Sequence, residues 1–327
     1  MKDLSDLSIL VTCFNKELHI DAFVSNLIDI LQWSPQIVIV DDHSTDFSLD
    51  ILRSKLSDRS NVQIVGNESN LGSAASRNLA LSLANREFVF FWDIDDEIDI
   101  NILIQMVGEM RVSNAAINQG KFTTSELDSN KKASKYSNAK TVNISENQSL
   151  LLHEMGFWRF IYLRRFLLKY GMQFVPSFSE LGGRYFILDD VFWMIWITSV
   201  DEPMVFSQSE SPLYLYNITN HTSSSWRKFQ RQAMLFPKAS ILFLNRISAS
   251  PARIDLALNA TFEKMLTHLR YLTISMWLKA LPHALLFLFL AKKLDGKIVL
   301  GQYVAFLKTI RKAFGNTYYQ LFQRSEA

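Results

Sequence analysis

The first hundred residues alternate between short apolar runs and amphipathic segments, and this alternation limits the fold more than any other feature. The apolar runs predict buried strands and lie at 7–15, 36–46, 61–67 and 87–93. The segments between them have helical spacing and lie at 19–33, 48–56 and 72–85. Strands and helices in this order predict βαβ units and a parallel sheet.

Polar side chains collect where the predicted strands end. In open parallel sheets, ligands bind beyond the carboxyl ends of the strands. We therefore expect a ligand site at this edge of the sheet. The residues concerned are Thr12 and Asn15 after the first strand, Asp41 and Asp42 after the second, and Asp93, Asp95 and Asp96 after the fourth.

The densest group of acids is the stretch FFWDIDDEID at 90–99. Like charges this close repel one another unless something neutralises them, so we expect strain in the absence of a cation. Asp93 and Asp95 offer two carboxylates, the kind of ligand that Mg²⁺ takes together with phosphate oxygens and water. The alternative is that Asp95, Asp96 and Glu97 cap and charge the first turn of the next helix; for Glu97 and Asp99 we adopt this explanation.

A third polar segment is NLGSAASRNLAL at 70–81. Gly72 permits a tight turn there, and Arg77 lies one turn inside the following helix. From that position Arg77 is able to reach phosphates or the nearby acids. Taken alone, the segment favours an ordinary surface arginine.

Together these segments resemble the family 2 glycosyltransferases of GT-A fold. The resemblance rests on VTCFNKE, on IVIVDDHSTD with His43 in place of the usual glycine, and on two further motifs that occur in order before residue 99. Those motifs are Asn70, Gly72, Arg77 and Asn78, then Asp93, Asp95 and Asp96.

The resemblance implies a donor site and a cofactor. Thr12, with Asn15 beside it, contacts the base; Asp41 or Asp42 contacts uracil or ribose, and Arg77 the base or the diphosphate. Asp93 faces the ribose or the metal. Asp95 is then the main ligand of Mg²⁺ or Mn²⁺, and Asp96 supports it.

Three further segments complete the implied site. YFILDDVFW at 185–193 resembles the stretch that carries the family's catalytic base, which implies Asp190 as the base with Asp189 beside it. The alternative is that both are acidic residues at the start of a helix. GFWRFIYLRRFL at 156–167 implies an acceptor site in which Trp158 stacks on a sugar and Arg164 or Arg165 meets phosphate; the alternative is a packed amphipathic helix. His221 either approaches the diphosphate or metal or is simply exposed.

We therefore expect a Rossmann-like GT-A fold, a mostly parallel sheet with flanking helices, plus a helical C-terminal region. Residues 1–228 would form the GT-A domain, with a nucleotide-sugar-binding half at 1–99 and an acceptor half at 100–228. Residues 229–327 would form the basic helical region.

Charge separates the two ends of the chain, although its net charge is +2. Residues 226–327 carry +12 and residues 1–225 carry −10, which suggests an anionic partner for the basic part. The apolar stretch at 276–294 has only eight unbroken apolar residues, too few to span a membrane. It predicts either a membrane-interface helix, with Lys292, Lys293 and Lys297 on anionic headgroups, or a core or homodimer helix.

The remaining features bear on compartment and activity. The single cysteine, Cys13, excludes an intramolecular disulfide. The N-terminal residues do not have the pattern of a signal peptide. We therefore expect a cytoplasmic protein, which would be peripheral on the inner face of the membrane if lipid is its partner. No nucleic-acid-binding module is recognisable, so we expect no nucleic-acid partner.

The resemblance implies an inverting, metal-dependent transfer of a sugar from a nucleotide sugar to a glycan or lipid-linked acceptor in surface polysaccharide synthesis. Among nucleotide sugars, a UDP-sugar is the favoured donor. One alternative is a sugar nucleotidylyltransferase, but the loop TCFNKELH lacks the glycines that would hold a triphosphate. The other is a non-catalytic membrane- or partner-binding protein.

Overall fold

The computed structural model describes residues 3–124, 141–148, 151, 156–175, 189–217, 223–247, 253–269, 272 and 274–294. The chain forms two compact units. The first contains residues 1–147, 155–176 and 201–220. The second contains residues 148–154, 177–200 and 221–327.

An eight-stranded sheet with the order β3-β2-β1-β4-β9-β6-β10-β8 forms the core of the first unit. Its first four strands are parallel. All of them except the half-buried edge strand β3 are almost uniformly buried, as expected of strands that are covered on both faces. They are β1 (Leu7–Cys13), β2 (Gln36–Asp41), β3 (Val62–Gly66) and β4 (Phe88–Asp93). The mixed half contains β6 (Ile117–Gln119), β8 (Val142–Asn143), β9 (Phe160–Leu163) and β10 (Pro203–Phe206).

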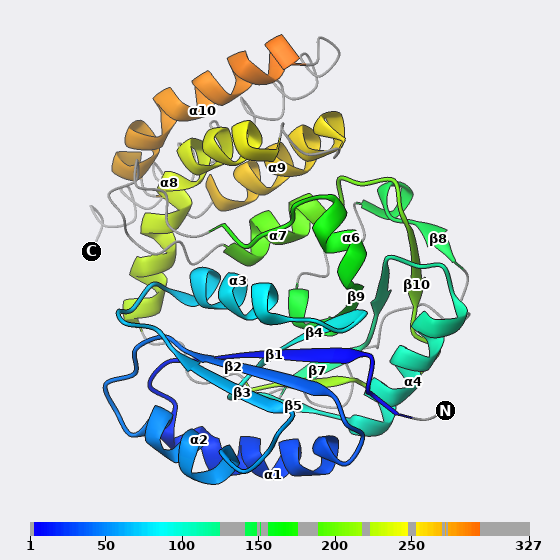
Figure 1. Cartoon of the computed structure of the whole chain (residues 1–327). Coiled ribbons are helices and arrows are strands. Elements are labelled where there is room, and N and C mark those ends of the chain that lie inside the picture. The colour runs from blue at the N-terminus through cyan, green and yellow to red at the C-terminus, as the bar shows by residue number, and fades with distance from the viewer. Residues whose placement is uncertain are drawn as a thin grey trace, which may run out of the picture. The chain divides into compact units, whose positions relative to one another are not determined.

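Helices cover both faces of the parallel half (Figure 1). The helices α1 (Ile20–Leu31) and α2 (Ser48–Leu56) lie on one face, and α3 (Ser73–Leu83) lies on the other. The apolar stripe predicted for α1 is the face that the structure buries, with Phe23 and Leu27 in its middle. The predicted alternation of strands and helices in the first hundred residues is therefore confirmed. Also in this unit are α4 (Ile100–Val112), α6 (Arg164–Lys169) and the 3₁₀ turns η1 (Glu17–His19), η2 (Ser145–Asn147) and η3 (Phe157–Arg159).

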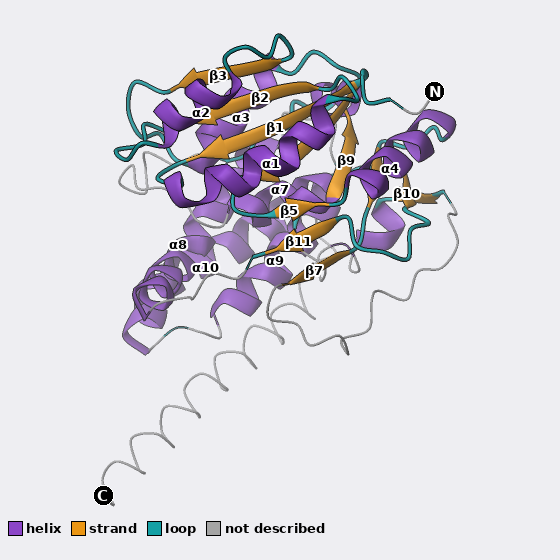
Figure 2. Ribbon diagram, turned by 90° about the horizontal axis from the view of Figure 1, so that it is seen from below, coloured by secondary structure: helices purple, strands orange, loops and turns teal. Residues whose placement is uncertain are grey.

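A second, three-stranded sheet lies beside the acidic stretch. It has the order β5-β11-β7, formed by β5 (Glu97–Ile98), β11 (Tyr214–Tyr216) and β7 (Phe122–Thr124), and Figure 2 shows the three strands side by side. Tyr214 pairs with Ile98 in this sheet. The small sheet therefore brings residues from near position 215 to the end of β4.

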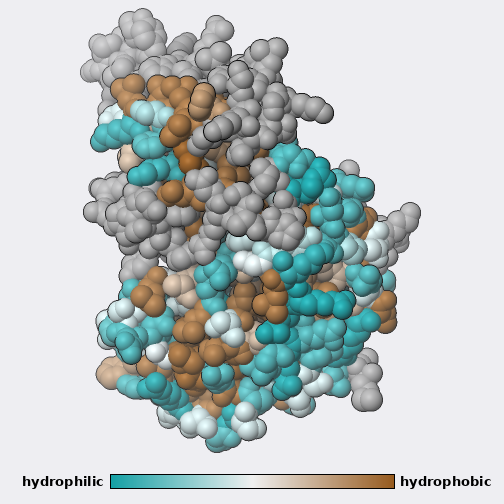
Figure 3. Space-filling view, turned by 45° about the horizontal axis from the view of Figure 1, so that its top comes forward, coloured by the Kyte–Doolittle hydropathy of each residue, from teal (hydrophilic) through white to brown (hydrophobic). Residues whose placement is uncertain are grey.

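The second unit is helical. It contains α7 (Asp189–Ile197), α8 (Ser223–Ile247), α9 (Ile254–Leu269) and α10 (Ile274–Leu294). Aromatic rings join these helices: Phe236 stacks on Phe192 with ring centroids 5.1 Å apart and on His268 at 4.6 Å. Leu258 and Phe262 of α9 are buried. Figure 3 shows hydrophobic side chains, in brown, at the surface of this unit. Among the described helices, none has the length and hydrophobicity needed to cross a membrane.

Candidate active site

The ends of the parallel strands bring the predicted acids together. Thr12 of β1 lies opposite Asp93 of β4, and the next residue, Cys13, lies opposite Asp41 of β2. Because the three strands are parallel, their polar ends share one edge of the sheet. The structure thus assembles a single polar site from segments that are far apart in the sequence, such as those of Thr12 and Asp93.

Asp41 and Asp42 point into the protein and order the neighbouring loops. The Asp41 carboxylate accepts hydrogen bonds from the backbone N–H of Ser44 at 2.9 Å and from its hydroxyl at 2.5 Å. The Asp42 carboxylate accepts from Asn67 Nδ2 and from the backbone N–H of Gly72, both at 2.8 Å. Both aspartates are almost fully buried. In this structure they shape the walls of the site.

The first loop is joined to the second through Asn15. Its backbone N–H donates to Ser44 Oγ at 3.0 Å, and its side-chain oxygen accepts from the backbone N–H of Thr45 at 2.8 Å. Asn15 and His43 both have positive φ angles, 52° and 60°. Each loop therefore makes a sharp turn at the edge where the strand-end residues meet.

Arg77 reaches the acid cluster from α3. Its Nη2 donates to Asp93 Oδ1 at 3.0 Å. The guanidinium lies 4.4 Å from the ring centroid of Phe157 and 5.4 Å from that of Phe174. Gly72 precedes α3 with a φ of 88°, as the predicted tight turn requires. Arg77 is thus a positioned residue of the site and not an ordinary surface arginine.

Asp95 pairs with a residue that the sequence did not single out. Lys16 Nζ donates to Asp95 Oδ2, although the two residues are 79 positions apart in the chain. On the other side of Asp95, Asn217 Nδ2 donates to its backbone oxygen at 2.7 Å. The only sequence signal for Lys16 was its place in the polar loop after the first strand.

Asp96 is held in the interior by β11. Its carboxylate accepts from the Tyr214 hydroxyl and from the backbone N–H of Asn217, both at 2.8 Å. Burial raises the pKa of Asp96 to about 7, and these hydrogen bonds act against that shift. Both carboxylate oxygens are thus engaged by the protein. We interpret Asp96 as the residue that fixes the loop.

Asp93 and Asp95 fit a partial site for a divalent cation. Their side chains are 24% and 20% exposed, so a ligand can reach them. Mg²⁺ and Mn²⁺ suit carboxylate oxygens, and Mg²⁺ usually binds one or two of them together with substrate phosphates and water. Within the described part of the chain, no group of three or more acidic, histidine or cysteine side chains forms a metal cage.

Two cations and several hydrogen bonds act against the repulsion expected in this cluster, and the expectation that it is strained without a metal stays a prediction. Arg77 supplies a positive charge to Asp93, and Lys16 supplies one to Asp95. Asp96 is stabilised by its hydrogen bonds to β11. The chain itself therefore offsets part of this repulsion, while the negative charges of Asp93 and Asp95 still contribute to the raised pKa of Asp96.

Trp158 lies close to the site but not open to it. Its ring stacks on Tyr214 at 4.4 Å and on Tyr216 at 5.5 Å between ring centroids, and it is 9% exposed. A Cβ on Gly156 would come within 2.9 Å of this ring, so the turn that admits the tryptophan needs glycine. Trp158 therefore supports the small sheet that holds Asp96.

The structure places Arg164 and Arg165 away from the acids. Leu163, just before them, pairs with Phe88 at the start of β4, and the Arg164 N–H donates to the backbone oxygen of Glu87 at 2.7 Å. Asp93 ends the same strand, so it lies roughly 20 Å further along. The two arginines are not part of the strand-end site.

Asp189 and Asp190 are the first residues of α7 in the helical unit. Asp189 is buried, and Asp190 Oδ1 accepts from the backbone N–H of Val191 at 2.8 Å. On α9, burial lowers the pKa of Lys264, and the negative charges of Glu263 and Asp190 act against that shift. The role of the two aspartates as base stays a prediction. His221 lies outside the described residues.

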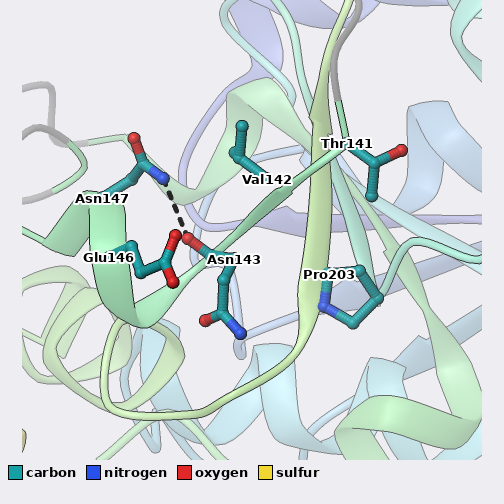
Figure 4. A pocket seen from close by; sticks show the side chains of 6 residues that line it. All are labelled: Thr141, Val142, Asn143, Glu146, Asn147 and Pro203. Atoms are coloured by element: carbon teal, nitrogen blue, oxygen red, sulfur yellow. Dashed lines mark hydrogen bonds between the residues drawn. The ribbon is translucent and has the colours of Figure 1, made fainter.

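A pocket of about 630 Å³ lies elsewhere in the first unit (Figure 4). It is formed around β8, η2 and the start of β10, at the far edge of the sheet from β1. Its lining includes Asn143, Glu146 and Pro203 and none of the predicted site residues. We therefore base the candidate site on the strand ends and not on this pocket.

Comparison with known proteins identifies a family. The sequence matches the family described as Glycosyl transferase family 2 over residues 8–176. The cholesterol galactosyltransferase of Borreliella burgdorferi is 29% identical over 111 residues, which are 34% of this chain and 31% of that protein. The poly(ribitol-phosphate) beta-N-acetylglucosaminyltransferase TarS of Staphylococcus aureus is 36% identical over 95 residues, 28% of this chain and 16% of that protein. The matched stretches span less than a third of either relative.

Two solved structures are similar over most of the chain. The crystal structure of S. aureus TarS 1-349 in complex with UDP-GlcNAc has a TM-score of 0.69 and 16% identity, and covers 96% of this chain and 92% of that one. The mannosyltransferase PcManGT from Pyrobaculum calidifontis, in complex with GDP-Man and Mn²⁺, has a TM-score of 0.50 and 16% identity, with 97% and 82% covered. At these identities the likeness shows a shared fold, which is GT-A.

Proposed function

The chain belongs to glycosyl transferase family 2, and from that premise we propose that it is an inverting, metal-dependent glycosyltransferase. It would move a sugar from a nucleotide-diphosphate sugar to a hydroxyl group of a glycan or glycolipid. We choose a UDP-sugar first because the similar TarS structure contains UDP-GlcNAc. Surface polysaccharide synthesis is the proposed context, since TarS is named for transfer to poly(ribitol-phosphate).

The observation that carries this proposal is the meeting of four separate polar segments at one edge of the sheet. Thr12 lies opposite Asp93, and Arg77 bonds to Asp93. We propose that the donor's base lies against the loop of Thr12 and Asn15. Of the two aspartates at the end of β2, Asp41 is the better candidate for contacting the donor's base, because its carboxylate accepts two hydrogen bonds and that of Asp42 accepts three.

Asp95 is the proposed main ligand of Mg²⁺ or Mn²⁺, with Asp93 beside it. When bound, such an ion supplies positive charge to the departing nucleoside diphosphate. Arg77 would hold Asp93 in position and add a fixed positive charge at the same edge. Asp96, Tyr214 and Asn217 would keep the turn after β4 in the shape that presents both carboxylates.

The transfer itself needs a base. The acceptor oxygen attacks the anomeric carbon, the bond from that carbon to the diphosphate oxygen breaks, and the acceptor's proton must be removed. We propose Asp190 for this role, with Asp189 as the alternative, on the strength of the family resemblance of the stretch at 185–193. Of the pair, Asp189 is buried, which favours Asp190 as the residue that meets the acceptor.

We also propose that the helical unit contacts an anionic membrane surface through α10. Four large apolar side chains on this helix are exposed, namely Leu278, Leu285, Leu286 and Phe289. The part of the chain that contains them carries a strong positive charge. A lipid-linked acceptor would make such a contact useful.

The test is donor-dependent release of nucleoside diphosphate from a panel of nucleotide sugars with Mn²⁺ or Mg²⁺. We expect Asp95→Asn to lower turnover by about 10²–10³-fold and Asp190→Asn by about 10²–10⁴-fold, the ranges for loss of charge stabilisation and of a base. The control is Asp29→Asn, which removes an exposed carboxylate of α1 and should leave turnover unchanged. If none of the nucleotide sugars in the panel gave release of nucleoside diphosphate, the proposal would be contradicted.

A further inference from the structure

Lys16 and Asp95 form an ion pair that the protein holds from both sides. The backbone N–H of Lys16 donates to Ser48 Oγ at 2.8 Å, which fixes the start of its side chain. Asn217 Nδ2 donates to the backbone oxygen of Asp95 at 2.7 Å, which fixes the other partner. Two anchored residues from distant parts of the chain therefore meet at this carboxylate.

The two cations of the acid cluster differ in how firmly they are held. The Arg77 side chain is 12% exposed and lies over the ring of Phe157, where it would be costly to move. The Lys16 side chain is 31% exposed. Lysine is a strongly hydrated charge on a flexible stem, so it exchanges partners more easily than a stacked arginine. Of the two, Lys16 is the cation that can leave.

Resting on the proposed function, we infer that Lys16 is a built-in competitor of the divalent ion for Asp95. The ammonium group and the ion have the same sign of charge, so both cannot lie against one carboxylate without strong repulsion. The ion must therefore displace Lys16. Metal binding to the protein alone would be weakened by that displacement, and Asp95 would stay paired with Lys16 until a ligand arrives.

The same exchange links the metal to the donor. A diphosphate brings negative charge to the place where the released ammonium lies, and this gives Lys16 a new partner. The donor thus removes part of the cost of displacing Lys16. Metal and nucleotide would each strengthen the binding of the other, by the same factor, because coupling between two binding sites is reciprocal.

Mn²⁺ binding to the full-length, nucleotide-free protein tests the competition, measured from the electron paramagnetic resonance signal of unbound Mn²⁺. We expect Lys16→Met to bind Mn²⁺ about ten-fold more tightly than the wild type, a scale typical for changes next to metal ligands. Lys16→Arg, which keeps the charge, should bind like the wild type. Adding Asp95→Asn to Lys16→Met should abolish the gain.

The matched control is Lys55→Met. It also removes one lysine from an ion pair, since Nζ of Lys55 on α2 lies 3.0 Å from Oδ1 of Asp21 on α1. This variant should bind Mn²⁺ like the wild type. If it gained as much as Lys16→Met, the effect would be one of net charge and the inference would be overturned. Lys16→Gln serves as a second neutral variant, and melting curves identify any variant that does not fold.

Equal or weaker Mn²⁺ binding by both neutral Lys16 variants overturns the inference, and so does a gain that survives Asp95→Asn. These measurements contain no nucleotide sugar, so their outcome is independent of turnover. Failure of the proposed function would instead appear as the absence of nucleoside diphosphate release with every donor. The two failures are therefore distinguishable.

Discussion

At the scale of single residues, His43 shows that the site loops carry backbone strain. It occupies the position at which family 2 glycosyltransferases usually have glycine, and its φ is 60°. A side chain costs about 1–2 kcal/mol in this left-handed region, and glycine avoids that cost but loses about 0.5–1 kcal/mol more entropy on folding. We expect His43→Gly to raise the free energy of unfolding by about 0.5–1 kcal/mol, measured by urea denaturation.

His43→Ala separates strain from contact. Alanine keeps the Cβ and its strain but removes the imidazole, whose Nδ1 lies 3.4 Å from the backbone oxygen of Asn67. We expect the alanine variant to be no more stable than the wild type. If alanine stabilised the protein as much as glycine, the imidazole and not the backbone would be the source of the instability.

The positions of the site residues could be predicted from the sequence, whereas the residues that they contact could not. The positions of Asp93 and Asp95 follow from the strand that precedes them, because a buried apolar run has a recognisable end. The partners Lys16 and Tyr214 come from segments 79 and 118 residues away from the acids they contact. Such pairs depend on how separate elements are arranged in space, and local periodicity contains no information on that.

At the scale of elements, Asp99 shows the simplest use of an acid in the stretch 90–99. It is the N-cap of α4, and its Oδ1 accepts from the backbone N–H groups of Asn101 at 2.8 Å and Ile102 at 3.2 Å. The prediction that it belongs to the start of the next helix is therefore confirmed. We expect Asp99→Ala to lower the free energy of unfolding by about 1 kcal/mol, measured by chemical denaturation.

Asp99→Asn is the control for this prediction. Asparagine caps helices about as well as aspartate, so most of the stability should return. An equal loss in both variants would mean that the charge of Asp99, and not its hydrogen bonds, stabilises the helix. Activity should survive in both, because the side chain faces the backbone of α4 and not the strand-end site.

Short elements were harder to predict than long ones. The stretch 156–167 was expected either as an acceptor site or as an amphipathic helix, yet it forms η3, then β9, then the start of α6. β9 lies between β4 and β6 and its four residues are all buried, so tertiary packing overrides local preference there. The four parallel strands escaped this ambiguity because each is a distinct apolar run and helices separate them along the chain.

At the scale of the whole molecule, the most unusual feature is a helix that is apolar on two faces. Ala280, Ala284 and Phe287 of α10 are buried, and α10 packs along α8. Leu285 and Phe289 are 48% and 63% exposed on the other face. An exposed apolar face of this kind usually marks a contact with lipid or protein. Together with the +12 charge of residues 226–327, it favours an anionic lipid surface.

Sedimentation with lipid vesicles tests this contact. We expect binding to vesicles that contain an anionic lipid, weaker binding at higher salt, and at least about ten-fold weaker binding for Leu285→Glu with Phe289→Glu, because two carboxylates would face anionic headgroups. Val112→Glu with Leu168→Glu makes the same exchange at two exposed apolar positions of the first unit and should bind normally. Binding that is indifferent to the α10 change would exclude this face as the lipid contact. If the wild type did not bind vesicles but formed a dimer, and the α10 variant were a monomer, the face would be assigned to a second copy of the chain.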